Sequence, residues 1–360
     1  MPISFASRSA PTDVGGYRAF AGGLHFAFLA ALTLLAGCRS PSGVESLHRF
    51  DFTSPHMGAL FKISLYAKDR PTARSAAEAA FQRVAALDDI MSDYQADSEL
   101  MRLCEKPVGV PVPISADLFG VLQRAQKIAE LSHGAFDVTV GPYVRLWRFS
   151  RKKLALPSTT EIEAARASVG WQKLWLDAHT RTATLLASNM RLDLGGIAKG
   201  YAADQALRLL QGRGLDRALV AASGDIAIGN SPPGQRGWKI AISAMSGRTN
   251  ETTHTLLLRN AGISTSGDTE QFIAINGLRY SHIVDPATGL GLTERRQVTI
   301  IAPDATTSDA LATAVSVLGV TPGLTLVESL PHCAALILTA GDGQQVTVTS
   351  RRFRKLSGQE

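Results

Sequence analysis

One short segment combines an acid, a lysine and three glycines: residues 191–202, which read RLDLGGIAKGYA. The pattern predicts the end of a strand carrying Asp193, a glycine turn, and a helix whose first turn carries Lys199. Backbone N–H groups in such a turn and helix start point outward with partial positive charge, so the segment suits a phosphorylated ligand. Its spacing matches neither the P-loop nor the dinucleotide-binding fingerprint. The alternative is a strand–turn–helix corner without a ligand.

Asp309 and Thr313 lie four residues apart in a segment that predicts a helix over residues 308–318. Side chains at this spacing share one helix face, so the carboxylate and the hydroxyl would point the same way. Together with a backbone carbonyl they would form an all-oxygen site, which suits Mg²⁺ better than zinc. The alternative is capping, because Ser, Thr and Asp at a helix start satisfy its free N–H groups.

Two further side chains offer chemistry at the ends of predicted elements. His282 follows a predicted strand and precedes an Asp-Pro-Ala-Thr-Gly turn. A histidine there can take a proton from an attacking hydroxyl, and a purely structural histidine is an equal alternative. Tyr94 follows the end of a predicted helix, where its ring could stack on a planar ligand.

Mixed helices and strands must position these groups. Apolar spacing predicts helices over residues 72–91, 116–132, 196–210 and 308–318, with another beginning near residue 158. It predicts strands over residues 61–66, 136–140, 174–186 (a pair), 218–228, 238–243, 253–258, 271–275, 298–301, 334–338 and 346–349. Because helices and strands do not alternate strictly, the sequence favours an α+β fold over a doubly wound sheet.

The N-terminal segment indicates export. Arg8 and Arg18 precede an uncharged run rich in Ala, Leu and Phe, which closes with residues 35–38, LAGC. A basic start, an apolar middle and small residues at the end are typical of a secretory signal. Residues 35–38 are similar to a bacterial lipobox and predict lipidation of Cys38. An uncleaved anchor is the alternative, since the run approaches the roughly 20 residues that a spanning helix needs.

We therefore expect a lipoprotein signal peptide at residues 1–37, a tether at 38–50 and one domain at 51–355. The protein would be exported and held at the membrane by its lipid anchor, facing the periplasm. The net charge is +6, but the basic residues are scattered, so we expect no nucleic-acid partner. Cys104 and Cys333 are far apart in the sequence and could pair in an oxidising compartment.

Taken in order, several segments resemble the ApbE family, the FAD:protein FMN transferases, over nearly the whole chain after the signal. The segments are Met57-Gly58; Met91-Ser92 with Tyr94 and Ser98-Glu99-Leu100; Phe136-Asp137-Val138-Thr139 with Pro142 and Leu146-Trp147; Asp193 to Tyr201; Ser223-Gly224-Asp225; Thr265-Ser266-Gly267-Asp268; His282-Ile283-Val284-Asp285-Pro286 with Thr288-Gly289; and Asp309 to Thr313.

The resemblance implies a single domain of the ApbE-type T-fold, FAD as donor substrate and Mg²⁺ as the metal. FMN would be transferred to a threonine hydroxyl of an acceptor protein, with release of AMP. Family acceptors are exported or membrane-bound redox subunits. By this likeness His282 would be the base. The metal would be held by Gly196, through its carbonyl, with Asp309 and Thr313. The FAD pocket would be lined by Met57, Tyr94, Ala135, Phe136, Asp137, Asp193, Lys199 and Ile283.

The chain departs from the family pattern at three places. Ser223 stands where a glycine is usual, so the backbone there should be less free. Ala59 replaces a usual Thr, and Cys104 stands where Asn is common. Two other functions stay open at this point: a pyrophosphatase that splits FAD with water, and a lipoprotein that binds flavin without catalysis.

Overall fold

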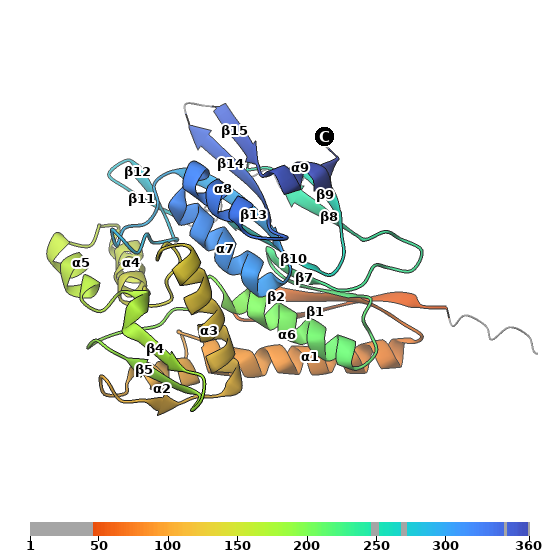
Figure 1. Cartoon of the computed structure of the whole chain (residues 1–360), viewed down its shortest axis with the longest axis horizontal. Helices are drawn as coiled ribbons and strands as arrows, with labels where there is room; N and C mark the ends of the chain where they lie inside the picture. Colours follow the sequence, from red (N-terminus) through yellow and green to blue (C-terminus); the bar gives the residue numbers. More distant parts are fainter. Residues whose placement is uncertain (1–45, 246–251, 268–271, 342–343, 359–360) are drawn as a thin grey trace, which may run out of the picture. The chain divides into compact units, whose positions relative to one another are not determined.

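The computed structural model describes residues 46–245, 252–267, 272–341 and 344–358 (Figure 1). The expected signal peptide, Cys38 and most of the expected tether lie outside the described residues, as does Asp268. Within the described ranges, no helix is long and apolar enough to cross a membrane. The last three residues expected in the tether, 48–50, instead begin the first strand.

The largest sheet in the described part of the chain has eight strands, and every neighbouring pair is antiparallel. In spatial order they are β1 (His48–His56), β2 (Ala59–Ala67), β6 (Ala218–Ala222), β7 (Asp225–Ile228), β10 (Ala261–Gly267), β13 (Arg295–Ala302), β14 (Ala334–Gly341) and β15 (Gln344–Thr349). Smaller sheets pair β3 (Val112–Pro113) and β4 (Leu174–Asp177) with β5 (Thr182–Leu185), β8 (Trp238–Ser243) with β9 (Thr252–Leu258), and β11 (Phe272–Ile275) with β12 (Leu278–Ser281).

Helices pack on this sheet and extend beyond it. They are α1 (Arg70–Met91), α2 (Glu99–Cys104), α3 (Ala116–Leu131), α4 (Gly141–Lys153), α5 (Thr159–Arg166), α6 (Ala198–Gly212), α7 (Ala305–Leu318), α8 (Val320–Ser329) and α9 (Arg351–Ser357). In Figure 1, α6 lies between α1 and α7 along one side of the sheet, and its contacts with both helices agree with that view. The mixture of a large antiparallel sheet with these helices is the expected α+β fold.

Both faces of the sheet are covered, as the period of two in a strand requires. On β2, Phe61, Ile63 and Leu65 are fully buried and join the core formed with α1, α6 and α7. The opposite face packs against β8, β9 and α9, where Leu336 and Phe353 are fully buried. A core on each side holds the sheet rigid, so elements anchored on it can position a site.

Three local expectations were wrong. Residues 136–140 form turns instead of a strand, because the Asp137 carboxylate accepts both the N–H and the hydroxyl of Thr139, at 2.7 Å each. Residues 191–193 are not the end of a strand but a loop with one isolated bridge, Val140 to Arg191. Residues 218–228 are two strands, separated by a turn at residues 223–224.

Two questions left open by the sequence are answered. Ser223 takes the left-handed region that the usual glycine would favour, with φ of 56°. The family departure therefore changes the strain at this turn and leaves the turn in place. Cys104 and Cys333 are both free thiols and do not pair.

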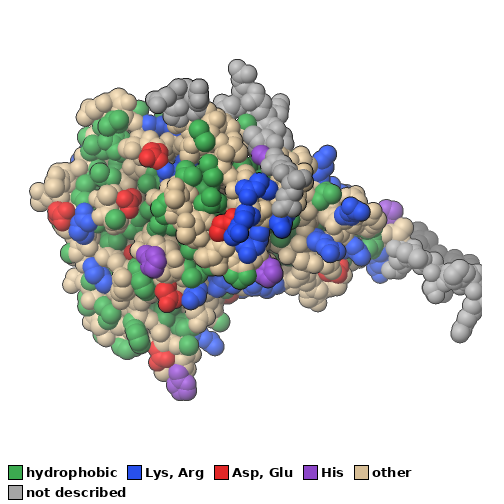
Figure 2. Space-filling model, turned by 45° about the horizontal axis from the view of Figure 1, so that its top comes forward, with side chains coloured by type: hydrophobic (Ala, Val, Ile, Leu, Met, Phe, Trp, Pro, Cys, Tyr) green, Lys and Arg blue, Asp and Glu red, His purple; other side chains and the backbone are tan. Residues whose placement is uncertain are grey.

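On the face drawn in Figure 2, basic side chains form separate groups with acidic and apolar side chains between them.

Candidate functional site

The start of α6 crosses α7 at very short range, and two glycines make this possible. A Cβ added to Gly200 would lie 2.3 Å from the carbonyl oxygen of Ala305, closer than real Cβ contacts allow. The Gly200 N–H donates to Asp309 Oδ2 at 3.0 Å. A Cβ added to Gly196 would lie 2.9 Å from Thr313 Oγ1 and 3.3 Å from the Phe136 ring. Glycine is thus required wherever α7 approaches this corner.

The three predicted metal-binding residues therefore come together. Asp309 and Thr313 lie one turn apart on α7, and Gly196 precedes α6 beside Thr313. Their oxygens are a carboxylate, a hydroxyl and a carbonyl, which is a set that hard cations prefer. Within the described ranges, no group of three His, Cys, Asp or Glu residues that could hold a metal is found. The assignment of these three residues as magnesium ligands stays a prediction.

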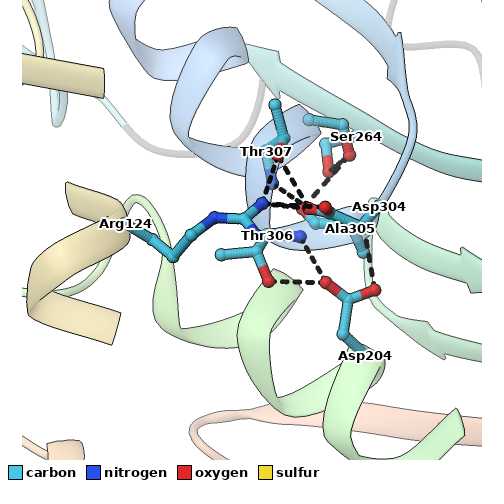
Figure 3. A network of polar contacts seen from close by, with 8 residues as sticks. Arg124, Asp204, Ser264, Asp304, Ala305, Thr306 and Thr307 are labelled. Carbon is cyan, nitrogen blue, oxygen red and sulfur yellow. Dashed lines mark hydrogen bonds and ion pairs between the residues drawn. The ribbon is translucent and has the colours of Figure 1, made fainter. Parts of the chain in front are cut away.

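Asp309 does not cap its own helix, because other side chains do so (Figure 3). The N-cap of α7 is Asp304, whose Oδ1 accepts the N–H of Thr307 at 2.8 Å. Arg124, from α3, binds both Asp304 oxygens at 2.6 and 2.8 Å. Asp204, from α6, accepts two further N–H groups of the first turn at 2.9 and 2.8 Å. The capping interpretation of Asp309 is therefore wrong, since the caps lie one turn earlier.

Two buried carboxylates share this corner with one lysine. Asp309 and Asp225 are each only 3% exposed, and the Lys199 ammonium forms an ion pair with Asp225. Burial, followed by the charge of Asp225, raises the pKa of Asp309 to about 7, against the opposite effect of Lys199. Burial alone would lower the pKa of Lys199, but both carboxylates hold it above its ordinary value. The charges at this corner would be balanced better by an added cation.

A second cluster surrounds Asp193, in the loop before α6. The Asp193 N–H donates to the Val138 carbonyl at 2.8 Å, and Asp193 Oδ1 accepts the Gly195 N–H at 2.8 Å. Burial, then the charge of Asp93, raises the pKa of Asp193 to about 6. This cluster is continuous with the metal corner, since Gly195 and Gly196 are adjacent.

Arg148, on α4, belongs to this cluster and was not expected from the sequence. Its guanidinium forms an ion pair with Asp93 and lies 3.8 Å from Asp193 Oδ2. It also lies over the ring of Tyr94, 4.1 Å from the centroid. No spacing signal could have revealed these contacts, because the partners are distant in the sequence and only the fold brings them together.

The predicted flavin residues 135–137 lie in the turn between α3 and α4. Asp137 is 6% exposed, and burial raises its pKa despite the hydrogen bonds from Thr139. It lines a cavity of about 220 Å³ with Trp171, Tyr143 and other residues, including Pro286 and Ala287. Among the residues that the structure describes, the buried Tyr143 hydroxyl has no hydrogen-bond partner. The cavity beside Asp137 therefore contains a polar group, the Tyr143 hydroxyl, that could form a further hydrogen bond.

The remaining three predicted residues lie in two loops. His282 is exposed and follows β12, and Ile283 donates its N–H to Ser281 Oγ at 3.1 Å. Their loop packs on α4, where Trp147 Nε1 donates to the Gly289 carbonyl at 2.9 Å. Met57 lies in the β1–β2 turn and donates its N–H to Asp88 of α1 at 3.0 Å. The structure thus places Met57 in the β1–β2 turn, and His282 and Ile283 in the loop after β12.

The comparisons with known proteins agree with this architecture. A family model, the ApbE family, matches residues 57–337. The FAD:protein FMN transferase of Treponema pallidum is 32% identical over 344 residues, covering 89% of this chain and 95% of the relative. The transferase of that name from Vibrio cholerae is 31% identical over 322 residues, covering 88% and 93%.

Solved structures give the same result. The flavin transferase ApbE from Vibrio cholerae superposes with a TM-score of 0.78 at 28% identity, covering 86% of this chain and 100% of that one. The apo form of the Pseudomonas stutzeri flavinyl transferase ApbE has a TM-score of 0.77 at 30% identity, covering 87% and 98%. Sequence and fold together show that this chain belongs to the ApbE family.

Proposed function

We propose that this protein is a Mg²⁺-dependent FAD:protein FMN transferase, which moves FMN from FAD to a threonine hydroxyl of an acceptor protein and releases AMP. The observation that carries the proposal is the convergence of the glycine corner before α6 with Asp309 and Thr313 on α7. The names of the relatives support the same activity.

The residues at this corner fit magnesium. They offer oxygen ligands only, and the buried Asp309 carboxylate faces a second buried carboxylate, Asp225, with Lys199 as the nearby cation. A hard divalent cation prefers such oxygens and would favour the ionised form of Asp309. When bound, the metal would neutralise charge on the pyrophosphate of FAD.

The chain's own residues would bind and orient the diphosphate. Lys199 sits in the first turn of α6, where free N–H groups and the positive end of the helix favour anions. Phosphoryl transfer depends mainly on such positioning and charge stabilisation. Phe136 lies beside Gly196 at this corner, and Arg148 links Asp193 to Tyr94, so the nucleotide would bind along these residues.

The transfer would be a single displacement at the FMN phosphorus. The acceptor hydroxyl oxygen forms a bond to the FMN phosphorus, and the bridging P–O bond of the pyrophosphate breaks, so AMP leaves with the electron pair. His282 would take the hydroxyl proton, since neutral imidazole is basic near pH 7. Its place on an exposed loop is suited to meeting an acceptor protein at the surface.

We further propose that the domain is exported and anchored through a lipid on Cys38, facing the periplasm, because residues 35–38 read LAGC after an apolar run. Exported or membrane-bound redox proteins would then be within reach as acceptors. Metabolic labelling with a radioactive fatty acid tests the anchor: Cys38→Ala should abolish labelling, and a labelled variant would exclude this site.

The activity is tested with FAD, Mg²⁺ and an acceptor protein that carries a target threonine. We expect mass spectrometry to find FMN attached to that threonine, and AMP in equal amount. Free FMN with an unmodified acceptor would instead establish the pyrophosphatase. FAD that binds and survives long incubation with Mg²⁺ would identify a binding protein without catalysis.

A further inference from the structure

Tyr94 has an unusual environment for a large aromatic residue. Its side chain is 81% exposed, in the loop that follows α1. An aromatic side chain left in water loses the free energy that its burial would give, so a ring this exposed is suited to binding a partner. One face already has such a partner, the Arg148 guanidinium 4.1 Å from the centroid. The rest of the ring remains open.

Arg148 is itself held from two directions. It pairs with Asp93, next to Tyr94 in the sequence, and it lies 3.8 Å from Asp193 in the glycine corner. The side chains of the two acids are only 17% and 14% exposed, so solvent screens the guanidinium less than it would at an open surface. The planar guanidinium can stack and donate several hydrogen bonds at once, which a lysine could not do.

We propose that Arg148 is a positioning residue of the flavin site, which fixes the Tyr94 ring so that its open face stacks on the planar ring system of the nucleotide. The ion pairs with Asp93 and Asp193 fix the position of the Arg148 guanidinium, and the guanidinium in turn fixes the Tyr94 ring. The contact with Asp193 also connects the loop that carries Tyr94 to the corner that would bind the diphosphate. This inference rests on the proposed use of FAD, and it assigns a role to a residue that no motif singled out.

Equilibrium binding of FAD without Mg²⁺ tests the inference separately from catalysis. Arg148→Met should weaken FAD binding roughly 3- to 30-fold, the range of a partly desolvated cation–π contact. Arg148→Lys keeps the charge but loses the planar stack, so it should restore only part of the affinity. Arg145→Met, on an exposed position of the same helix, is the matched control and should bind FAD like the wild type.

A double-mutant cycle with Tyr94 separates positioning from general stability. If Arg148 acts through the ring, Arg148→Met should add little to the loss caused by Tyr94→Ala. The visible circular dichroism of bound flavin should change in both single variants and not in Arg145→Met. Thermal unfolding of every variant checks that the fold persists.

The outcomes are distinct. Wild-type protein that binds no FAD would overturn the proposed function. Wild-type protein that binds FAD, with Arg148→Met binding equally well, would overturn the positioning role alone. Fully additive losses in the cycle, or complete rescue by Arg148→Lys, would also contradict it, because either result would remove the stacking argument.

Discussion

Replacing Asp309 separates two roles of one carboxylate. It accepts the Gly200 N–H at 3.0 Å, and it would be the charged ligand of magnesium. Asp309→Asn keeps an oxygen for Gly200 and removes the charge, whereas Asp309→Ala removes both. We expect both variants to lose FMN transfer, and Asp309→Ala to be less stable than Asp309→Asn.

The magnitudes follow from the burial of this side chain, which is 3% exposed. A rise in the pKa of Asp309 from 3.8 to about 7 means that ionising it in the metal-free protein costs up to about 4 kcal/mol. Asp309→Asn avoids this cost and should be at least as stable as the wild type. Asp309→Ala avoids the same cost but leaves the Gly200 N–H unpaired, so it should be about 1–3 kcal/mol less stable than Asp309→Asn.

The sign of the pH dependence is fixed by the same pKa. Because the folded protein holds the Asp309 proton more tightly than the unfolded chain, ionisation destabilises the fold as the pH rises from about 4 to about 7. The stability advantage of Asp309→Asn over the wild type should therefore be complete above pH about 7 and vanish near pH about 4.

Urea unfolding at several pH values, with and without Mg²⁺, measures both roles. Magnesium should stabilise the wild type, because a ligand that binds only the folded state does so, and should leave both variants unchanged. If metal-free Asp309→Asn proved less stable than the wild type near pH 7, the account of the buried charge would be wrong, and if it proved no more stable than Asp309→Ala, the role given to the Gly200 hydrogen bond would be wrong. Wild-type FMN transfer by either variant would refute the metal assignment.

Three further predictions concern single residues. His282→Ala should slow FMN transfer roughly 10²–10⁴-fold with unchanged FAD affinity, and an unchanged rate would exclude it as the base. Gly200→Ala should lower the free energy of unfolding by about 1–3 kcal/mol, because its Cβ would meet the Ala305 carbonyl; an unchanged melting temperature would contradict the close crossing. Asp193→Asn should stabilise the protein by about 1–3 kcal/mol near pH 7 but not near pH 4, because burial raises the pKa of Asp193 to about 6; equal stabilisation at both values in urea unfolding would rule this out.

The sequence predicted most strands and five helices, because their buried faces have regular periods, but it missed α2, α4, α8 and α9. On β2 the alternation of Phe61, Ile63 and Leu65 reports directly which face is buried. The strand prediction was wrong at residues 136–140, although apolar residues alternate there too. The Asp137 carboxylate accepts hydrogen bonds from Thr139, two residues on, and this turns the chain. These local side-chain hydrogen bonds stabilise the turn over the strand.

The site could be predicted only where its parts share one element. Asp309 and Thr313 are four residues apart on one helix, so their common face follows from spacing. The approach of Gly196 to Thr313 depends on how α6 crosses α7, and only the resemblance to a family suggested it. The start of α7 had a readable signal in Asp304, a good N-cap residue three positions before Thr307, which was missed.

The caps of α7 explain why Asp309 is available for a metal. Asp304 and Asp204 already satisfy the free N–H groups of the first turn, so α7 does not need a third carboxylate for its own start. Asp309 instead faces the start of α6, beside Asp225, and buried carboxylates this close are costly without added positive charge. Lys199 supplies one charge and pairs with Asp225. A cation bound at Asp309 would supply the rest, at the point where the helix start favours a diphosphate.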